Sequence, residues 1–506
     1  MERRVFLKSS VQTLTAAAIL RGQETNATHK LPTTESQYQV VKNYVENTPI
    51  PEYRWASSQA YEAFRDMKVG VRIHWGIYSI THQAHESWPY LSLPFPDRHR
   101  YNQFYKTWNP AGFDADRWTS LFADAGCRMF AFTTKHHEGF SMFDTHTRVR
   151  SRANWIAPGG PQLESCDLAY SIMETPFRRD VVKELCSAAH RRNLKIALYF
   201  SHPDWYDADF RPYSFHPLQV PSSEKLTGTP VSENQRKGEL SATVSDPTPA
   251  ETKRMVDRHR AQLTELLTNY GRIDMLSLDM WLGPAVWPEM RRTLLHLRQL
   301  QPDVMLRARG IGNYGDYYTP EGFVPGSKEN TDVPWMVIYP LGTSFSYDAE
   351  ARNYKGAAWI VRNIVDTVAK GGNFQIGIGP DANGEFHPEA ASQLRESGRW
   401  LKVNGEGIYA TRPRPGDAWR EGENIRYTRS KDSTATYCFL LNWPGRSVTL
   451  TSLPANPNVQ VHMLGYPNAL QSRYDSSKGL VIEIPEALQD PAKRPCDHAW
   501  ALRLTA

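Results

Sequence analysis

Between residues 55 and 400, apolar strand-like runs alternate with amphipathic segments, and this alternation constrains the fold more than any other feature. The run 194–201, "LKIALYFS", has the composition of a buried strand and follows a segment, 179–193, whose apolar residues recur at helical spacing. Thr248 and Glu251 have the spacing of a capping box, with Pro249 at the first helical position. Such an α/β pattern over this length predicts a parallel sheet closed as a TIM-like (β/α) barrel.

The expected elements of this barrel can be placed on the sequence. We expect strands at 69–80, 127–137, 194–201, 272–279, 304–310 and 373–380. We expect helices at 114–126, 179–193, 248–271, 287–301, 356–371 and 388–405. The polar stretch 207–246 lies between a strand and its helix, and a loop of that length in a barrel is uncommon and often functional.

The pattern changes near residue 405, where short runs rich in β-branched and aromatic residues replace the alternation. They are separated by Pro, Asn and Gly, as "SVTLTSL" and "GLVIEIP" illustrate. This pattern of short runs predicts a small antiparallel β-sandwich. The chain is therefore expected to contain a catalytic barrel at 26–404 and a C-terminal β-sandwich domain at 405–506.

The first 25 residues have the pattern of a twin-arginine export signal. Arg3 and Arg4 precede Phe6-Leu7-Lys8 and a mild apolar stretch that is too short and too polar to span a bilayer. We therefore exclude 1–25 from the fold and expect a periplasmic or secreted bacterial protein without a membrane span.

Composition and charge exclude some functions. The net charge of +5 falls to +3 without the leader, and no basic run with interleaved aromatics follows it, so nucleic acid is not an expected partner. The five cysteines are widely spaced and indicate neither a zinc site nor a disulfide framework. Fifteen Trp and 24 Tyr would suit surfaces that stack on sugars, although a large core also uses Trp.

Polar and aromatic residues collect where the expected strands end, which in a TIM barrel is the face that carries the active site. Packing alone does not explain so many polar and aromatic residues at the strand ends. They are His74, Trp75, His136, His137, Tyr199, Asp279 and Arg309, with Asp316 and Glu321 in the loop after Arg309.

The histidine pair 136–137 admits several readings: metal binding, acid/base chemistry, sugar recognition or a structural role. Adjacent side chains on a strand point to opposite faces, so binding one metal ion would need an irregular backbone, and no HExxH-like spacing is present. No Gly-rich phosphate loop follows a strand, which argues against nucleotides. Two carboxylates on different strand ends, among aromatic and neutral donors, favour glycoside cleavage.

Several segments together resemble glycoside hydrolase family 29, the α-L-fucosidases. The segments are "HWGIYS", "AGCRMFAFTTKHHEGFSMFDT", "LKIALYFSHPDWY", "LLTNYGRIDMLSLD" and "GRWLKVNGEGIYATRP". The resemblance covers about 55–413. It implies a TIM-like barrel followed by a β-sandwich, and hydrolysis of terminal α-L-fucosides with retention of configuration and without metal or cofactor.

The resemblance also implies roles for individual residues. Asp279 matches the nucleophile, and Glu321 matches the acid/base. A second set matches residues that hold or border the sugar of a fucosylated oligosaccharide or glycoconjugate: His74, Trp88, His136, His137, Tyr199 and Arg309. Neutral imidazoles both donate and accept, so they suit several hydroxyls in a small polar pocket.

Three departures from the family pattern affect the pocket wall rather than the two carboxylates. Relatives usually carry an acidic residue directly before the tryptophan matched by Trp88, where this chain has Ser87 with Glu86 one position earlier. Ser277 stands where Trp is frequent, and Gly377 where Asn is frequent. A glycosidase for a related sugar such as L-galactose, or a catalytically silent glycan-binding protein on the same scaffold, is therefore an alternative. Linkage preference and oligomeric state stay open.

Overall fold

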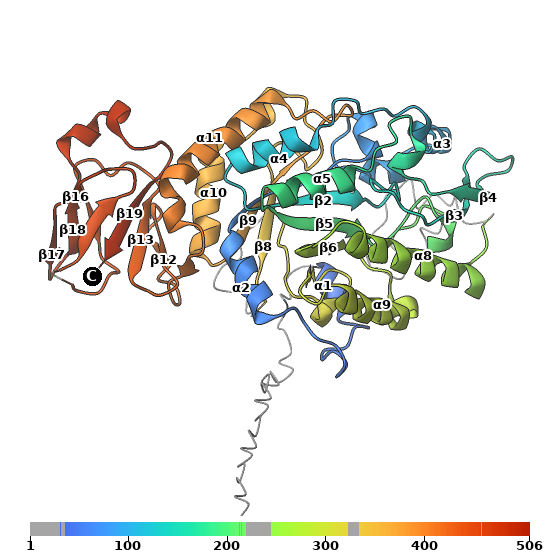
Figure 1. Cartoon of the computed structure of the whole chain (residues 1–506), viewed down its shortest axis with the longest axis horizontal. Coiled ribbons are helices and arrows are strands. Elements are labelled where there is room, and N and C mark those ends of the chain that lie inside the picture. The colour runs from blue at the N-terminus through green and yellow to red at the C-terminus, as the bar shows by residue number, and fades with distance from the viewer. Residues whose placement is uncertain are drawn as a thin grey trace, which may run out of the picture.

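The computed structural model describes residues 31, 36–211, 213, 215–218, 244–321, 333–456 and 458–505. Figure 1 shows a large α/β part and a smaller antiparallel β part, which lies beside helices α10 and α11. The expected signal, 1–25, and most of the long 207–246 stretch lie outside the described residues.

A seven-stranded parallel sheet forms the barrel wall, in the order β7-β6-β5-β2-β1-β9-β8. Each pair of neighbouring strands in this order is separated in sequence by at least one helix, as parallel pairing requires. The strands are β1 Val69–Ile73, β2 Met129–Lys135, β5 Lys195–Ser201, β6 Met275–Asp279, β7 Met305–Leu306, β8 Met336–Pro340 and β9 Asn373–Ile378.

The segment 317–321 closes the gap between the two outer strands. Arg307, just after β7, bridges to Tyr317, and Glu321 bridges to Ile338 of β8, both in parallel sense. The Ala308 amide donates to the Tyr317 carbonyl at 2.8 Å. The sheet is thereby continuous around a TIM-like barrel, and Glu321 is placed at the end of its closing segment.

The described α-helices alternate with these strands along most of this part of the chain. They are α1 Ser36–Val41, α2 Ser58–Met67, α3 Phe95–Tyr101, α4 Ala115–Asp124, α5 Val181–Arg191, α8 Pro249–Thr268, α9 Trp287–Leu300, α10 Ala357–Ala369 and α11 Pro388–Asn404. The predicted capping box of α8 is confirmed, because the Thr248 hydroxyl accepts from the Glu251 amide and the Glu251 carboxylate accepts from the Thr248 amide at 2.7 Å. Each of these contacts satisfies an amide that the first turn leaves without a helical partner.

The sequence prediction was wrong about several strand lengths. The expected strand 69–80 ends at Ile73, because the Trp75 amide turns to the Thr133 hydroxyl and a 3₁₀ helix follows at Ile77–Thr81. The expected strand 304–310 is reduced to β7, since the chain turns inward at Arg307 to pair with the closing segment. Strand β8 and the hairpin of β3 Val149–Asn154 and β4 Gln162–Leu168 were not predicted.

The C-terminal part is a sandwich of two antiparallel sheets, as predicted. One sheet runs β10-β12-β13-β19-β15-β16, with β11 beside β12, and the other runs β14-β18-β17. Tyr427 and Leu502 of the first sheet share a buried core with Leu450 and Ile482 of the second. The strands are β10 Arg412–Pro413, β11 Arg420–Glu421, β12 Ile425–Arg429, β13 Ala435–Leu440, β14 Ser447–Leu450, β15 Gln460–Met463, β16 Ala469–Leu470, β17 Ser472–Asp475, β18 Gly479–Glu483 and β19 Trp500–Thr505.

Other sequence expectations concern the domain border, disulfides and membrane segments. Helix α11 ends at Asn404, and the division at 404/405 stays a prediction. All five cysteines are unpaired. None of the helices in the described part of the chain is both long and apolar enough to cross a bilayer.

Candidate active site

Asp279 is the last residue of β6, at the carboxyl end of the barrel, and cationic and hydroxyl groups surround its carboxylate. Oδ1 accepts from Nη1 of Arg309 at 3.0 Å and lies 3.5 Å from Nη1 of Arg307. Oδ2 accepts from the Tyr199 hydroxyl at 2.7 Å. Burial alone would raise the pKa of Asp279, but the two guanidinium groups outweigh it and hold this pKa well below its usual range. Asp279 is thus a buried, ionised carboxylate.

Glu321 contacts the same two arginines as Asp279. Its Oε1 is 2.8 Å from Nη1 of Arg309 and 3.0 Å from Nη2 of Arg307. Burial would raise its pKa, but Arg309 and Arg307 together hold the pKa below its ordinary value. The Glu321 side chain is 40% exposed, whereas that of Asp279 is 12% exposed, so Glu321 is on the open side of the pair.

The two carboxylates are close enough to act on one glycosidic bond. Arg309 Nη1 contacts an oxygen of each, so those oxygens are separated by at most the sum of the two distances, about 5.8 Å. Retaining glycosidases hold their carboxyl groups roughly 5–5.5 Å apart and inverting ones about 6.5–9.5 Å. The upper limit for these two oxygens lies close to the retaining range and below the inverting range.

Both predicted histidines, 136 and 137, face one region rather than opposite sides. They lie just beyond β2, where a register shift between Thr133 and Lys135 precedes a turn, and their ring centroids are only 4.2 Å apart. The expectation of opposite faces is therefore wrong, because strand geometry ends at Lys135.

Each of these imidazoles is fixed through its Nδ1 atom by a serine. Ser87 Oγ lies 2.6 Å from Nδ1 of His136, and Ser201 Oγ lies 2.8 Å from Nδ1 of His137. Burial lowers the pKa of His137 to about 4 and that of His136 well below its usual range. Neutral rings with Nδ1 engaged retain Nε2 for polar groups of a ligand.

His74 follows β1, and its ring stacks on Phe345, with centroids 4.9 Å apart. The departure at Gly377 explains how Phe345 fits there, because a Cβ at Gly377 would approach the Phe345 ring to 2.3 Å. Absence of a side chain at 377 thus makes room for an aromatic wall beside His74. Sequence reasoning missed Phe345, which lies in a loop with no strand-end signal.

Trp88, predicted to border the sugar, forms one side of the site together with other aromatics. It is partly exposed, and its ring lies 4.9 Å from His137 and 5.5 Å from Trp205. The residue two positions earlier, Glu86, is buried with a left-handed φ of 54°. Burial raises the pKa of Glu86 to about 7, although amides of Ser346 and Phe345 oppose the rise.

Sequence reasoning named Arg309 but missed two other buried arginines. Arg307 is buried and lies two residues earlier, and the i, i+2 spacing within the predicted strand 304–310 was the available signal. Arg72 of β1 is also buried, with its guanidinium 4.9 Å from the centre of the Tyr199 ring. Together these three arginines provide the positive charge that keeps both carboxylates ionised.

Asp316, which the sequence places with Glu321 in the loop after Arg309, is not part of the site. It is fully buried in an ion pair with Arg298 and accepts hydrogen bonds from the Ala56 and Leu306 amides. Its role is structural. Glu329, a further carboxylate in the sequence after Glu321 and thus another candidate for the acid, lies outside the described residues.

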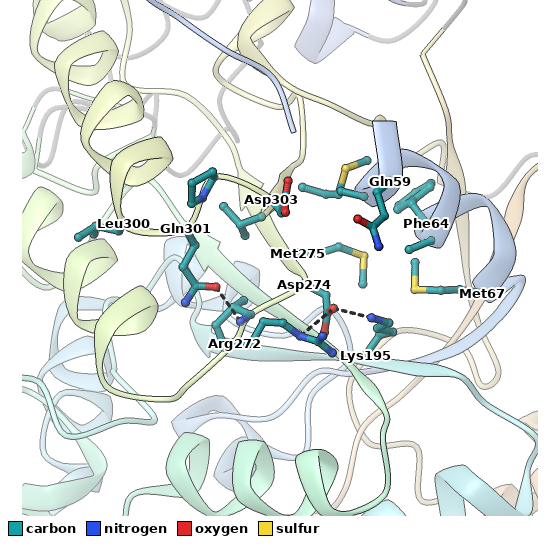
Figure 2. Close-up of a pocket in the computed structure, with 16 residues that line it drawn as sticks. Gln59, Phe64, Met67, Lys195, Arg272, Asp274, Met275, Leu300, Gln301 and Asp303 are labelled. Carbon is teal, nitrogen blue, oxygen red and sulfur yellow. Dashed lines mark hydrogen bonds and ion pairs between the residues drawn. The ribbon is translucent and has the colours of Figure 1, made fainter. Parts of the chain in front are cut away.

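A separate pocket of about 420 Å³ opens at the opposite end of the barrel. Figure 2 shows Lys195 and Arg272 directed toward Asp274, and the apolar side chains that line the same pocket include Met67 and Met275. Lys195 and Met275 are the first residues of β5 and β6, so this pocket is at the far end from Asp279. Among described residues, no group of three or more His, Cys, Asp or Glu side chains has a metal-binding arrangement.

Two family models match most of the chain. The α-L-fucosidase family model matches residues 39–406, and the α-L-fucosidase C-terminal domain model matches 420–505. The chain belongs to the α-L-fucosidase family. The family resemblance, the two-part fold and the assignment as a glycoside hydrolase are thereby confirmed.

Alignments with individual relatives cover most of this chain. The human tissue α-L-fucosidase is 28% identical over 469 residues, covering 87% of this chain and 88% of the relative. The solved structure of α-L-fucosidase isoenzyme 1 from Paenibacillus thiaminolyticus is 25% identical with a TM-score of 0.69, covering 88% and 98%. A Bacteroides thetaiotaomicron GH29 α-L-fucosidase shares the fold at 21% identity, with a TM-score of 0.67 and coverage of 89% and 95%.

Proposed function

We propose that this chain is an exported exo-glycosidase that removes terminal α-L-fucosyl residues from glycans with retention of configuration. The observation that supports it best is the pair of carboxylates, Asp279 and Glu321, whose facing oxygens share one nitrogen of Arg309. A separation of at most about 5.8 Å between these oxygens supports double displacement.

In the first step Asp279 is the nucleophile. Its carboxylate forms a bond to the anomeric carbon while the bond to the leaving oxygen breaks, and Glu321 gives that oxygen a proton. Asp279 suits this role because Arg309 and Arg307 keep it ionised. Glu321 is on the more exposed side, where a leaving group can depart.

In the second step Glu321 acts as the base. It takes a proton from water, the water oxygen bonds to the anomeric carbon, and Asp279 is released. Two inversions at the same carbon give net retention. The lowered pKa of Glu321 means that the proton needed for the first step is held only in acidic solution, so we infer an acidic optimum.

His74, His136 and His137 are proposed to hold the sugar hydroxyls, with Trp88 along one edge. Phe345, which Gly377 accommodates, gives the wall beside His74 an apolar surface. An apolar wall favours a sugar methyl group over a hydroxymethyl group, and thus fucose over L-galactose.

A comparison of two 4-nitrophenyl glycosides tests this function. The α-L-fucoside should be cleaved with a higher kcat/KM than the α-L-galactoside, and NMR should show the α-anomer of fucose as first product. Preference for the galactoside would assign the related sugar, β-fucose as first product would exclude retention, and no turnover with retained fucose binding would favour the silent glycan-binding alternative.

Export is a further part of the proposal, supported by the twin-arginine pattern at Arg3 and Arg4. Fractionation of cells that express the full chain should place the activity in the periplasm or medium. Replacement of both arginines by lysine should leave the activity in the cytoplasm, and unchanged fractionation would contradict this route.

A further inference from the structure

A continuous chain of hydrogen-bonding groups joins the nucleophile to one of the pocket histidines. The Tyr199 hydroxyl lies 2.7 Å from Oδ2 of Asp279 and 3.0 Å from Oγ of Ser201. Ser201 Oγ in turn lies 2.8 Å from Nδ1 of His137. Tyr199, Ser201 and Asp279 come from the neighbouring strands β5 and β6, whose register places Ser201 opposite Asp279. All four groups are buried.

The direction of each hydrogen bond follows from the number of protons available. Ionised Asp279 can only accept, so the single proton of the Tyr199 hydroxyl is donated to it. Tyr199 can then meet Ser201 only as an acceptor, which assigns the single Ser201 proton to Tyr199. Ser201 therefore accepts from His137, and the His137 proton is on Nδ1. Any other order leaves two lone pairs facing each other at 3.0 Å or less, which is costly in a buried site.

We propose that Ser201 is a positioning residue, which transmits the hydrogen-bond order imposed by Asp279 and fixes His137 as the tautomer protonated on Nδ1. Nε2 of His137 is then an acceptor, and it selects a sugar hydroxyl that donates. The proposal rests on the proposed function, in which Asp279 is the ionised nucleophile and His137 a sugar partner. Neutrality of the ring, whose pKa burial lowers to about 4, supports it.

The neighbouring histidine provides a matched comparison within the same site. Nδ1 of His136 contacts Ser87 Oγ at 2.6 Å, but the described contacts of Ser87 do not link it to Asp279. A change at Asp279 should therefore alter the tautomer of His137 and leave that of His136 unchanged.

Two variants of nearly unchanged shape test the direction of these hydrogen bonds by ¹H–¹⁵N correlation spectra of histidine side chains. The signals of His137 are assigned as those that are missing from the spectrum of His137→Gln. In the unchanged protein Nδ1 of His137 should carry the proton. In Asp279→Asn the new amide must direct its oxygen to the Arg309 and Arg307 donors and its NH₂ to Tyr199. Every bond of the chain then reverses, and the His137 proton should move to Nε2. Tyr199→Phe removes the acceptor for Ser201, which is then free to donate to His137, so the same shift is expected.

Kinetics test whether this order matters for the reaction. Ser201→Ala should lower kcat/KM for an aryl α-L-fucoside by about 10- to 100-fold, the range expected when a buried donor loses its partner. Ser397→Ala is the control for stability. Its hydroxyl is equally buried but lies on α11, where it donates to the Leu394 carbonyl at 2.8 Å. This variant should keep kcat/KM within about twofold.

The outcomes separate this inference from the proposed function. A His137 proton on Nε2 in the unchanged protein, or no shift in both Asp279→Asn and Tyr199→Phe, would overturn the hydrogen-bond order whatever the activity. Normal kcat/KM in Ser201→Ala would overturn its positioning role. The expected tautomers in a protein that cleaves no α-L-fucoside would support the order and contradict the proposed function.

Discussion

Nη1 of Arg309 lies 3.0 Å from Oδ1 of Asp279 and 2.8 Å from Oε1 of Glu321, so one nitrogen contacts both carboxylates. Two carboxylates at such a distance repel each other, and the positive charge of Arg309, together with that of Arg307, offsets this repulsion. Because the two groups interact, their apparent pKa values belong to the pair.

Replacing Arg309 should therefore change the pH dependence as well as the rate. In Arg309→Met the pKa of Asp279 should rise, since one of the two guanidinium groups that lower it is lost while Arg307 remains, and activity should disappear at a higher pH on acidification. We also expect kcat/KM to fall by about 10²-fold or more. Arg309→Lys keeps the charge and should shift the acid limb less. An acid limb of kcat/KM that is the same in all three proteins would contradict this account.

Sequence patterns predicted the barrel because its helices and most strands carry local signals, such as the capping box at Thr248. Sequence patterns did not predict the closing segment 317–321 or the short length of β7, because pairing between distant residues determines the course of the chain there. Strand ends similarly identified Asp279 and His137. Ser201 was not named, because its role depends on the register between β5 and β6, and Phe345 depends on space left by Gly377.

Glu321→Ala should show a strong dependence on the leaving group. A general acid typically contributes on the order of 10²–10⁴-fold, and an aryl leaving group with a low pKa needs little protonation. The variant should thus lose far more activity on a fucosylated oligosaccharide than on 4-nitrophenyl α-L-fucoside.

The pH profile gives a second measure of the same residue. Its lowered pKa means that unchanged protein should lose kcat/KM on the oligosaccharide as pH rises above this pKa, because the proton is lost. The aryl substrate should lose less over that range. Equal losses on both substrates in Glu321→Ala would move the acid role to another residue.

Glu138 should make the protein less stable as pH rises. It is buried beside His136, with Oε2 3.7 Å from Nδ1, and burial raises its pKa to about 8. In the unfolded chain a glutamate ionises near pH 4.3, so between that pH and about 8 the unfolded state binds fewer protons than the folded state. The free energy of unfolding therefore falls across this window.

Glu138→Gln removes this titration while keeping the shape of the protonated side chain. Relative to the unchanged protein, the variant should gain stability between pH 5 and pH 8, by a few kcal/mol in all. Urea denaturation at several pH values measures this difference. If the difference in unfolding free energy between the two proteins does not vary with pH, the carboxyl group is not the titrating group.

Asp279→Gly tests the nucleophile directly. Asp279 closes β6, and its carboxylate is held by Arg309, Arg307 and Tyr199, so truncation should stop formation of the covalent intermediate. The pocket histidines keep their serine partners, and fucose should still bind. We expect kcat to fall by several orders of magnitude, measured with 4-nitrophenyl α-L-fucoside.

Azide should restore cleavage by the Asp279→Gly protein. It is small and anionic, so it can enter the vacated space beside the two guanidinium groups and attack the anomeric carbon from that face. Attack without a covalent enzyme intermediate inverts the centre once, so the rescued product should be β-L-fucosyl azide. Arg298→Lys, outside the site, is a control that azide should not accelerate. A folded Asp279→Gly protein with near-normal activity in the absence of azide would rule out Asp279 as the nucleophile.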